Sequence, residues 1–207
     1  MTDKLMVDTN VLVYAYDNAN PVKQKKALAI LDELAITSGS SAGHSGKELL
    51  LVSKLPTVVM YTDGACKGNP GPGGYGVILK HKDQLKELSG GYRCTTNNRM
   101  ELMAVVKGLE ELKKPCLINL YSDSQYIVKA VTLGWAKNWQ KNNWLLPNKK
   151  PAKNIDLWQK VLSLAQKHQI NWFWLKGHGD NPDNKRCDRL AVLASNGDSL
   201  PEDEGFK

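Results

Sequence analysis

Apolar residues along the chain fall into short runs and periodic stretches, and three of the runs that follow residue 55 predict strands. Thr57–Thr62 is apolar and rich in β-branched residues. Tyr75–Lys80 and Leu85–Tyr92 have a similar pattern, and the short polar stretch HKDQ between them is typical of a hairpin turn. The main part of the chain is therefore predicted to begin with three strands, of which the second and third form a hairpin.

From Asn97 to Leu112 the apolar residues recur every three or four positions, which predicts an amphipathic helix. Its expected apolar face consists of Leu102, Val105, Val106, Leu109 and Leu112. Later patterns predict strands at Leu117–Tyr121 and Ile170–Leu175, and helices at Ile155–Lys167 and from about Ser124 and Lys185. The resulting order, β-β-β-α-β-α-α-β-α, predicts an α/β fold in which helices flank a mixed sheet.

A stretch of small and polar residues divides the chain into two unequal parts. Residues 37–46 read TSGSSAGHSG, a composition that is typical of a flexible linker. We therefore expect a short N-terminal strand–helix segment at residues 1–36, a linker at 37–55 and the main domain at 56–207.

Composition adds few constraints, but it excludes some classes of protein. The chain is 42% hydrophobic and 24% charged, as in soluble globular proteins. No apolar run approaches the roughly 18 residues of a membrane span, and the N-terminus lacks the features of a signal peptide. The four cysteines form no C-x-x-C pair, which favours reduced thiols over a zinc site or a disulfide framework. We expect a cytoplasmic protein with no membrane contact.

The net charge of +7 is concentrated in one part of the chain. The lysines and acids of residues 1–55 balance, so the whole excess lies in residues 56–207. Between Asp123 and Asp156 there is no acid, and the lysines there are Lys129, Lys137, Lys141, Lys149, Lys150 and Lys153. Such a stretch commonly binds phosphates, although charge alone leaves open a solvated lysine face without a partner.

Four acids occupy strand ends or the margins of apolar helix faces. Asp63 ends the first predicted strand and Asp123 the fourth, while Glu101 lies at the edge of an apolar helix face and Asp188 follows Cys187 on the last helix. If these acids converge, each close pair repels by about 4 kcal/mol at an effective dielectric constant of 20. Bound cations would offset that repulsion, and oxygen ligands favour magnesium or manganese. Four unrelated solvated or capping acids are the alternative at this stage.

Longer motifs decide between these alternatives. The segments YTDGACKGNPGPGGYGVIL, GYRCTTNNRMELMAV, LYSDSQYIVKAV and INWFWLKGHGDNPDNKRCDRLA occur in this order, together with GWAKNWQKNNW, KKPAKNIDLW and LPEDEGF. Residues 56–207 thereby resemble the bacterial type 1 ribonuclease H family throughout. The resemblance implies a ribonuclease H-like fold with a five-stranded mixed sheet flanked by helices. It also implies endonucleolytic hydrolysis of the RNA strand of RNA/DNA hybrids, leaving 5′-phosphate and 3′-hydroxyl ends.

The same resemblance implies a catalytic site. Asp63, Glu101, Asp123 and Asp188 match the metal-binding acids, and His178 matches a histidine that assists product release or proton transfer. Two Mg²⁺ ions are expected, with Mn²⁺ as an alternative. Two ions about 3.5–4 Å apart can activate a water and stabilise the leaving 3′ oxygen without a covalent nucleophile.

Substrate contacts are implied in the same way. The residues expected to line the minor groove of the hybrid, where amides can recognise ribose 2′-hydroxyls, are Cys66, Asn69, Asn97, Asn98 and Gln125. Thr96 and Asn138 match a pocket for a phosphate of the DNA strand. Cys94 replaces the arginine that often precedes TTNN, so this pocket is either weaker or completed by Arg93. The many glycines after Asp63 are expected to let backbone approach the nucleic acid, and Thr95 or Thr96 to cap the following helix.

The lysine stretch matches the basic protrusion of that family. Its expected substrate-binding residues, besides Asn138, are Trp135, Lys137, Trp139 and Lys141. Trp135 and Trp139 are four positions apart and would share a helix face. Whether these tryptophans pack on each other or stack on sugars is left open by the sequence.

The N-terminal segment has a different resemblance. MVDTNVLVYAYD and NPVKQKKALAILDEL resemble the opening strand and helix of a PIN-domain ribonuclease, and Asp8 matches the first metal acid of that family. The later acids of a PIN site do not follow before the linker, so we expect a fragment without activity of its own. It would pack on the main domain or mediate self-association of an otherwise monomeric protein, and no protein partner is evident.

Three other functions share some of these features. A nucleic-acid-binding module without catalysis would not need all four acids. A PIN nuclease that is targeted by its ribonuclease H part would need the missing PIN acids. A transposase or integrase would share the fold and the metal chemistry, but it would not be expected to contain TTNNRMEL and KGHGDNPDN. A hybrid-specific endoribonuclease is therefore the leading hypothesis.

Overall fold

The computed structural model describes residues 55–177 and 180–206, which belong to one compact unit that begins at Lys54. The expected strand–helix segment at residues 1–36, with its resemblance to PIN-domain ribonucleases, lies outside the described residues. All of the expected linker except Leu55 also lies outside them. Within the described residues, no helix is long and apolar enough to cross a membrane.

Five strands and five helices make up this unit. In chain order they are β1 (Thr57–Cys66), β2 (Gly71–His81), β3 (Gln84–Thr95), α4 (Asn97–Glu111), β4 (Leu117–Ser122), α5 (Gln125–Thr132), α6 (Trp135–Lys141), α7 (Ile155–Ala165), β5 (Gln169–Trp174) and α8 (Pro182–Ala194). The strand order across the sheet is β3-β2-β1-β4-β5. The pairs β1–β2 and β2–β3 are antiparallel, whereas β1–β4 and β4–β5 are parallel. The prediction of a five-stranded mixed sheet is confirmed.

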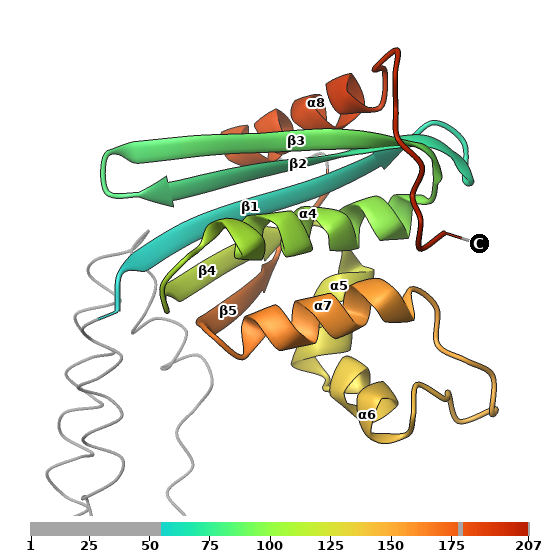
Figure 1. Ribbon diagram of the computed structural model, residues 1–207. Helices are drawn as coiled ribbons and strands as arrows, with labels where there is room; N and C mark the ends of the chain where they lie inside the picture. The colour runs from blue at the N-terminus through green and yellow to red at the C-terminus, as the bar shows by residue number, and fades with distance from the viewer. Residues whose placement is uncertain (1–54, 178–179, 207) are drawn as a thin grey trace, which may run out of the picture. The chain divides into compact units, whose positions relative to one another are not determined.

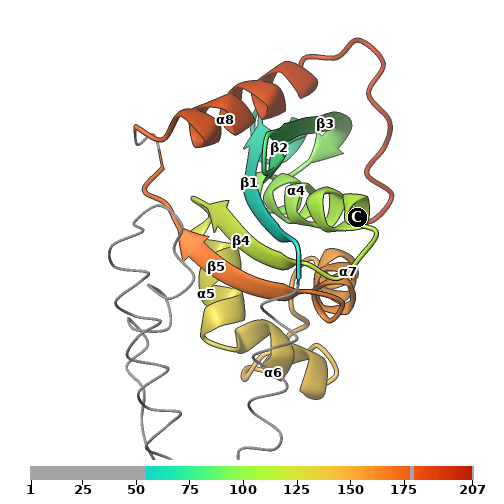
Figure 2. The same cartoon turned by 90° about the vertical axis from the view of Figure 1, so that its left-hand side faces the viewer.

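Helices cover both faces of the sheet. Figures 1 and 2 show α8 on one face, above β1–β3, and α4 on the opposite face, with α7 beside α4. Helix α6 lies beyond α5 and α7, away from the sheet, in both views. β1 and β4 are parallel neighbours, and β4 ends at Ser122, opposite Thr62 of β1. The carboxyl end of a parallel strand is a common location for a functional site in α/β proteins.

The helix predicted from the apolar period that begins at Asn97 is confirmed as α4. Leu102, Val105, Val106 and Leu109 are all at most 1% exposed, and they pack against Met60 of β1 within the main core. Burying a side chain of this kind stabilises the fold by about 1.5–3 kcal/mol before entropy is subtracted. The core therefore fixes the position of α4 relative to β1.

The first three strands are each several residues longer than predicted. β1 continues to Cys66, so Asp63 lies inside the strand rather than at its end. β2 begins at Gly71, which pairs with Thr95 of β3, and the following Gly73 and Gly74 pair with Cys66 and Ala65 of β1. Glycine has a low strand propensity, but the ladder supplies the hydrogen bonds and overrides it.

The helices differ from the prediction at two places. The helix expected from about Ser124 is in fact two helices, α5 and α6, separated at Gly134, which has a positive φ of 72°. Helix α8 begins at Pro182 rather than near Lys185, because the Asn181 side chain accepts hydrogen bonds from the backbone of Asp183 and Asn184. Proline is well suited to the first turn of a helix, where its missing N–H would have no partner.

Candidate active site

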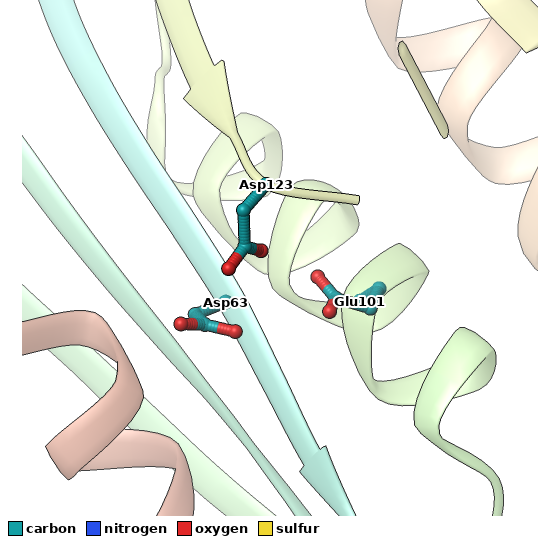
Figure 3. Close-up of side chains that lie close together, drawn as sticks. All are labelled: Asp63, Glu101 and Asp123. Carbon is teal, nitrogen blue, oxygen red and sulfur yellow. The ribbon is translucent and has the colours of Figure 1, made fainter. Parts of the chain in front are cut away.

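Three carboxylates converge beside the carboxyl end of β4. Asp63, Glu101 and Asp123 each present one oxygen, and these three atoms all lie within 4.8 Å of one another. Figure 3 shows Asp63 on β1, Glu101 on α4 and Asp123 just beyond the end of β4, with their carboxylates directed toward a common point. The structure thus brings together three of the four acids that the sequence singled out.

The sheet register explains how two of these acids meet. β1 and β4 are parallel neighbours in which Thr62 pairs with Ser122. Asp63 directly follows Thr62 and Asp123 directly follows Ser122, so the two acids lie next to each other on neighbouring chain segments. Glu101 arrives from α4, whose backbone lies directly against Gly64.

The environment of these acids opposes their ionisation. Asp63 is 6% exposed and Glu101 is 5% exposed. Burial, followed by the charges of Asp123 and Asp188, raises the pKa of Asp63 to about 8. Burial, followed by the charges of Asp63 and Asp123, raises the pKa of Glu101 well above its ordinary value. Among the described residues, none of the lysine or arginine ion pairs involves the three converging acids.

These residues fit a divalent cation. The Gly64 N–H donates to Oδ1 of Asp63 at 2.8 Å, and the Asn97 side chain donates to Oε1 of Glu101 at 3.5 Å. Oε2 of Glu101 is buried and has no hydrogen-bond partner among the described residues. A buried oxygen without a donor is costly, and a cation would satisfy it while offsetting the repulsion between the carboxylates. Oxygen ligands of this kind suit Mg²⁺, Mn²⁺ or Ca²⁺.

The fourth acid lies near this cluster. Asp188 is half-buried on α8, and its charge contributes to the raised pKa of Asp63. His178 lies outside the described residues. The preceding Gly177 comes close to the cluster, since a methyl group added there would lie 3.2 Å from Oδ2 of Asp123.

Four of the five residues predicted to line the minor groove lie near the start of α4: Cys66, Asn69, Asn97 and Asn98. The backbone N–H of Asn97 donates to Oδ1 of Asn69 at 3.2 Å, and Asn98 is exposed. Cys66 contacts the carbonyl oxygens of Gly71 and Thr95, each at 3.5 Å.

The predicted threonine cap of α4 is confirmed in its position but not in its side-chain hydrogen bond. Thr96 occupies the N-cap position but makes no capping hydrogen bond with its side chain. The hydroxyl of Thr95 instead donates to Asp203 at 2.6 Å. The side chain of Asn69 takes over part of the capping role, because it accepts the N–H of Asn97.

The other predicted substrate-binding residues lie on α5 and α6. Gln125 is the exposed first residue of α5, and its side chain accepts a hydrogen bond from Lys129 at 2.7 Å. On α6, four predicted residues line one open groove of about 750 Å³: Trp135, Asn138, Trp139 and Lys141. Lys137 and the other lysines between Asp123 and Asp156 are all exposed.

The question about the tryptophans receives a partial answer. Trp139 packs edge to face against Trp158, with ring centroids 5.9 Å apart, and so anchors α6 to α7. Trp135 is 42% exposed and lines the groove. The two side chains therefore have different environments, although they are one helical turn apart.

The glycines that follow Asp63 have internal packing roles, which the sequence pattern did not indicate. A methyl group at Gly76 of β2 would collide with the backbone carbonyl of Cys187 and lie 2.9 Å from Cβ of Leu190. The glycine therefore lets α8, which carries Asp188, lie directly on the sheet. The expectation from the sequence assigned these glycines to the approach of a nucleic-acid backbone.

An ion-pair network near the site was also missed. Arg99 is 2% exposed and donates to Asp203 from Nε at 2.6 Å and from Nη2 at 2.8 Å, and to both oxygens of Asp156 at 2.9 and 2.7 Å. Burial opposes ionisation of Asp156, but its bonds to Arg99 outweigh burial and lower its pKa. The available signal was the position of Arg99, one helical turn before Leu102 and Met103 on the buried face of α4.

Comparison with known proteins agrees with this arrangement. Residues 56–196 match the RNase H family model. The chain is 55% identical over 157 residues to a ribonuclease H of Trichodesmium erythraeum, which covers 76% of this chain and 100% of that relative. It is 54% identical over 151 residues to a ribonuclease H of Desulforamulus reducens, which covers 73% of this chain and 95% of that relative.

Solved structures show the same fold. LC9-RNase H1, described as a type 1 RNase H with the type 2 active-site motif, aligns with a TM-score of 0.63 and 28% identity, over 73% of this chain and 76% of that one. LC11-RNase H1, solved in complex with an RNA/DNA hybrid, aligns with a TM-score of 0.52 and 23% identity, over 66% and 95% of the two chains. With its family match, its relatives and a cluster of acids beside the end of β4, this chain belongs to the RNase H family.

Proposed function

We propose that this protein is an endonuclease that hydrolyses the RNA strand of RNA/DNA hybrids and leaves 5′-phosphate and 3′-hydroxyl ends. The observation that carries the proposal is the convergence of Asp63, Glu101 and Asp123 within 4.8 Å, beside the carboxyl end of β4. All three acids lie inside the segment that matches the RNase H family. Family membership supports the reaction, and the cluster supports the presence of its catalytic centre in this chain.

In this proposal, all four acids help to bind the divalent cations. Asp63, Glu101 and Asp123 would bind divalent ions directly, and Asp188 would complete the set from α8. When bound, two Mg²⁺ ions supply the charge that acidifies an attacking water and stabilises the leaving 3′ oxygen, and Mn²⁺ can take their place. The burial of Asp63 and Glu101 keeps bulk water away and strengthens these interactions. His178, which follows Gly177 in the chain, would assist proton transfer or product release.

Substrate recognition would involve two surfaces. Ribose 2′-hydroxyls would be recognised by Cys66, Asn69, Asn97 and Asn98 near the start of α4 and by Gln125 at the start of α5. The groove on α6 would hold the DNA strand through Trp135, Asn138, Trp139 and Lys141, while Lys137 and the neighbouring lysines attract phosphates. Thr96 would join Asn138 at a phosphate of that strand, and the complex of LC11-RNase H1 with a hybrid supports a substrate of this kind.

The remaining parts of the proposal concern organisation. Residues 56–207 would form the catalytic domain, residues 37–55 a flexible linker, and residues 1–36 a PIN-like fragment without activity. We place the protein in the cytoplasm as a monomer, with self-association through the N-terminal fragment as the alternative.

The decisive experiment offers four labelled substrates in the presence of Mg²⁺: an RNA/DNA hybrid, duplex RNA, duplex DNA and single-stranded RNA. We expect cleavage of the RNA strand of the hybrid, with 5′-phosphate ends, and no cleavage when EDTA removes the metal. Equal cleavage of duplex RNA, or no cleavage of the hybrid by folded protein, would overturn the proposal.

A further inference from the structure

The backbone contact between β1 and α4 is unusually close at one point beside the acids. A methyl group at Gly64 would lie 2.6 Å from the carbonyl carbon of Met100 and closer still to the amide nitrogen of Glu101. Both neighbours are backbone atoms of α4, so neither can rotate away. Ordinary contact of this kind begins at 3.4 Å. Any side chain at position 64 would therefore push the strand and the helix apart.

This contact lies between two of the converging acids. Gly64 is buried, directly follows Asp63 and faces Glu101 across the strand–helix interface. Its N–H donates to Oδ1 of Asp63 at 2.8 Å, which also orients that carboxylate. Figure 3 shows the Asp63 and Glu101 carboxylates on β1 and α4, on either side of this interface. The separation of the two backbones thus sets the separation of the two carboxylates.

We propose that Gly64 is a positioning residue that sets the Asp63–Glu101 gap and thereby makes the site selective for a small divalent cation. This inference rests on the proposed metal-dependent function. Mg²⁺ requires oxygen ligands at about 2.0–2.1 Å in near-ideal octahedral geometry, whereas Ca²⁺ accepts about 2.3–2.6 Å in flexible geometry. Widening the gap therefore disfavours Mg²⁺ more than Ca²⁺.

The chain offers a matched control on the same interface. Gly108 also lies on α4 against the sheet, but a methyl group there would meet side chains: Sδ and Cε of Met60 at 2.8 and 3.1 Å, and Cγ1 of Val77 at 3.1 Å. Gly108 is two helical turns from Glu101, and the methionine side chain can adjust. Gly108→Ala should strain the interface without moving the acids.

The test measures binding of Mg²⁺ alone and of Ca²⁺ alone by calorimetry, without substrate, to the unmodified protein, Gly64→Ala and Gly108→Ala. For Gly64→Ala we expect Mg²⁺ affinity to fall about tenfold to a hundredfold, the range for groups that support metal ligands, and Ca²⁺ affinity to fall less. Gly108→Ala should keep both affinities even if it melts at a lower temperature. Unchanged Mg²⁺ affinity in folded Gly64→Ala, or equal losses for both ions, would overturn the inference.

A second variant keeps the test decisive if Gly64→Ala does not fold. Glu101→Asp retains Gly64 and shortens one carboxylate by a methylene group, which widens the same gap without straining the backbone. The inference requires a larger loss for Mg²⁺ than for Ca²⁺ here too, and equal losses would contradict it. If the unmodified protein binds no divalent ion, the proposed metal site fails as well, so the two failures are distinguishable.

Discussion

At the scale of single residues, Asp63 has the environment of a metal ligand rather than of a structural acid. It is buried, two other carboxylates lie within 4.8 Å, and its nearest donor is a single backbone N–H. We expect Asp63→Asn and Asp123→Asn each to abolish cleavage while hybrid binding is retained, because an amide keeps the shape but lacks the charge that holds a cation. Gel-shift and cleavage assays check this. As a control, Asp83→Asn at the exposed β2–β3 turn should cleave hybrids at the normal rate. Normal turnover of Asp63→Asn would refute the assignment of Asp63 as a metal ligand.

The raised pKa of Asp63 predicts how pH affects the metal-free protein. Its pKa is about 8 in the fold, against 3.8 ordinarily. Between these values the folded protein holds a proton that the unfolded chain has released, so the free energy of unfolding falls as pH rises. Mg²⁺ replaces protons, and should therefore raise the melting temperature more at pH 8 than at pH 5. Thermal melts in EDTA and in Mg²⁺, each at pH 5 and pH 8, measure these melting temperatures. For Asp63→Asn, the melting temperature in EDTA should depend less on pH. If Mg²⁺ raised the melting temperature equally at both pH values, the prediction would be contradicted.

At the scale of elements, α4 joins the site to the C-terminal segment through Arg99. Removing this side chain would leave Asp203, which is 5% exposed, buried without its cation. We expect Arg99→Ala to lower the free energy of unfolding by about 3–5 kcal/mol, as for other broken buried pairs. Urea unfolding measures it. As a control, Lys107→Ala breaks an exposed ion pair with Glu110 on the same helix and should lower the free energy of unfolding by at most about 1 kcal/mol. If Arg99→Ala lowered it by a similarly small amount, the ion-pair network would contribute little to stability.

The elements also show what the sequence could and could not predict. Helix α4 was predictable because its apolar period runs unbroken from Leu102 to Leu109. The end of β1 and the start of β2 were not predictable, because Gly64, Gly71 and Gly73 have low strand propensity and become strand residues only through pairing with the neighbouring strands. The meeting of Asp63 and Asp123 depends on parallel pairing of strands about sixty residues apart, and their convergence was inferred from the family resemblance. One of the two partners of Arg99, Asp203, lies beyond α8, and no local pattern indicates where that segment returns.

Helix α6 and the loop after it supply most of the positive surface expected to meet phosphates. Lys137, Lys141, Lys149 and Lys150 are all exposed. Replacing all four by Ala should weaken hybrid binding and reduce the salt slope by roughly 0.9 for each lysine–phosphate interaction that is removed, while RNA-strand selectivity is retained. Titrations at several salt concentrations measure it. A control removes four exposed lysines elsewhere, Lys82, Lys86, Lys113 and Lys114, and should change the slope less. If selectivity for the RNA strand disappeared while the affinity for the hybrid was unchanged, these lysines would distinguish RNA from DNA rather than attract phosphates in general.

At the scale of the whole molecule, every residue proposed to take part in the reaction lies in residues 56–207. The family match begins at residue 56, and the acids span Asp63 to Asp188. The Trichodesmium erythraeum ribonuclease H aligns over its entire length with 157 residues of this chain, which leaves about a quarter of the chain without a counterpart. Residues 1–55 also carry no net charge, so they should add little to the attraction of phosphates.

We therefore expect a shortened protein that starts at Leu55 to fold and to cleave hybrids at nearly the full rate. Steady-state cleavage by the full chain and by the shortened protein measures this, and light scattering compares their oligomeric states. A change of oligomeric state with an unchanged rate would assign self-association to the N-terminal part. The shortened protein should also keep the Mg²⁺ affinity of the full chain, since every proposed ligand is retained. A large loss of turnover in a shortened protein that is folded and binds Mg²⁺ normally would show instead that residues 1–54 take part in catalysis or in substrate binding.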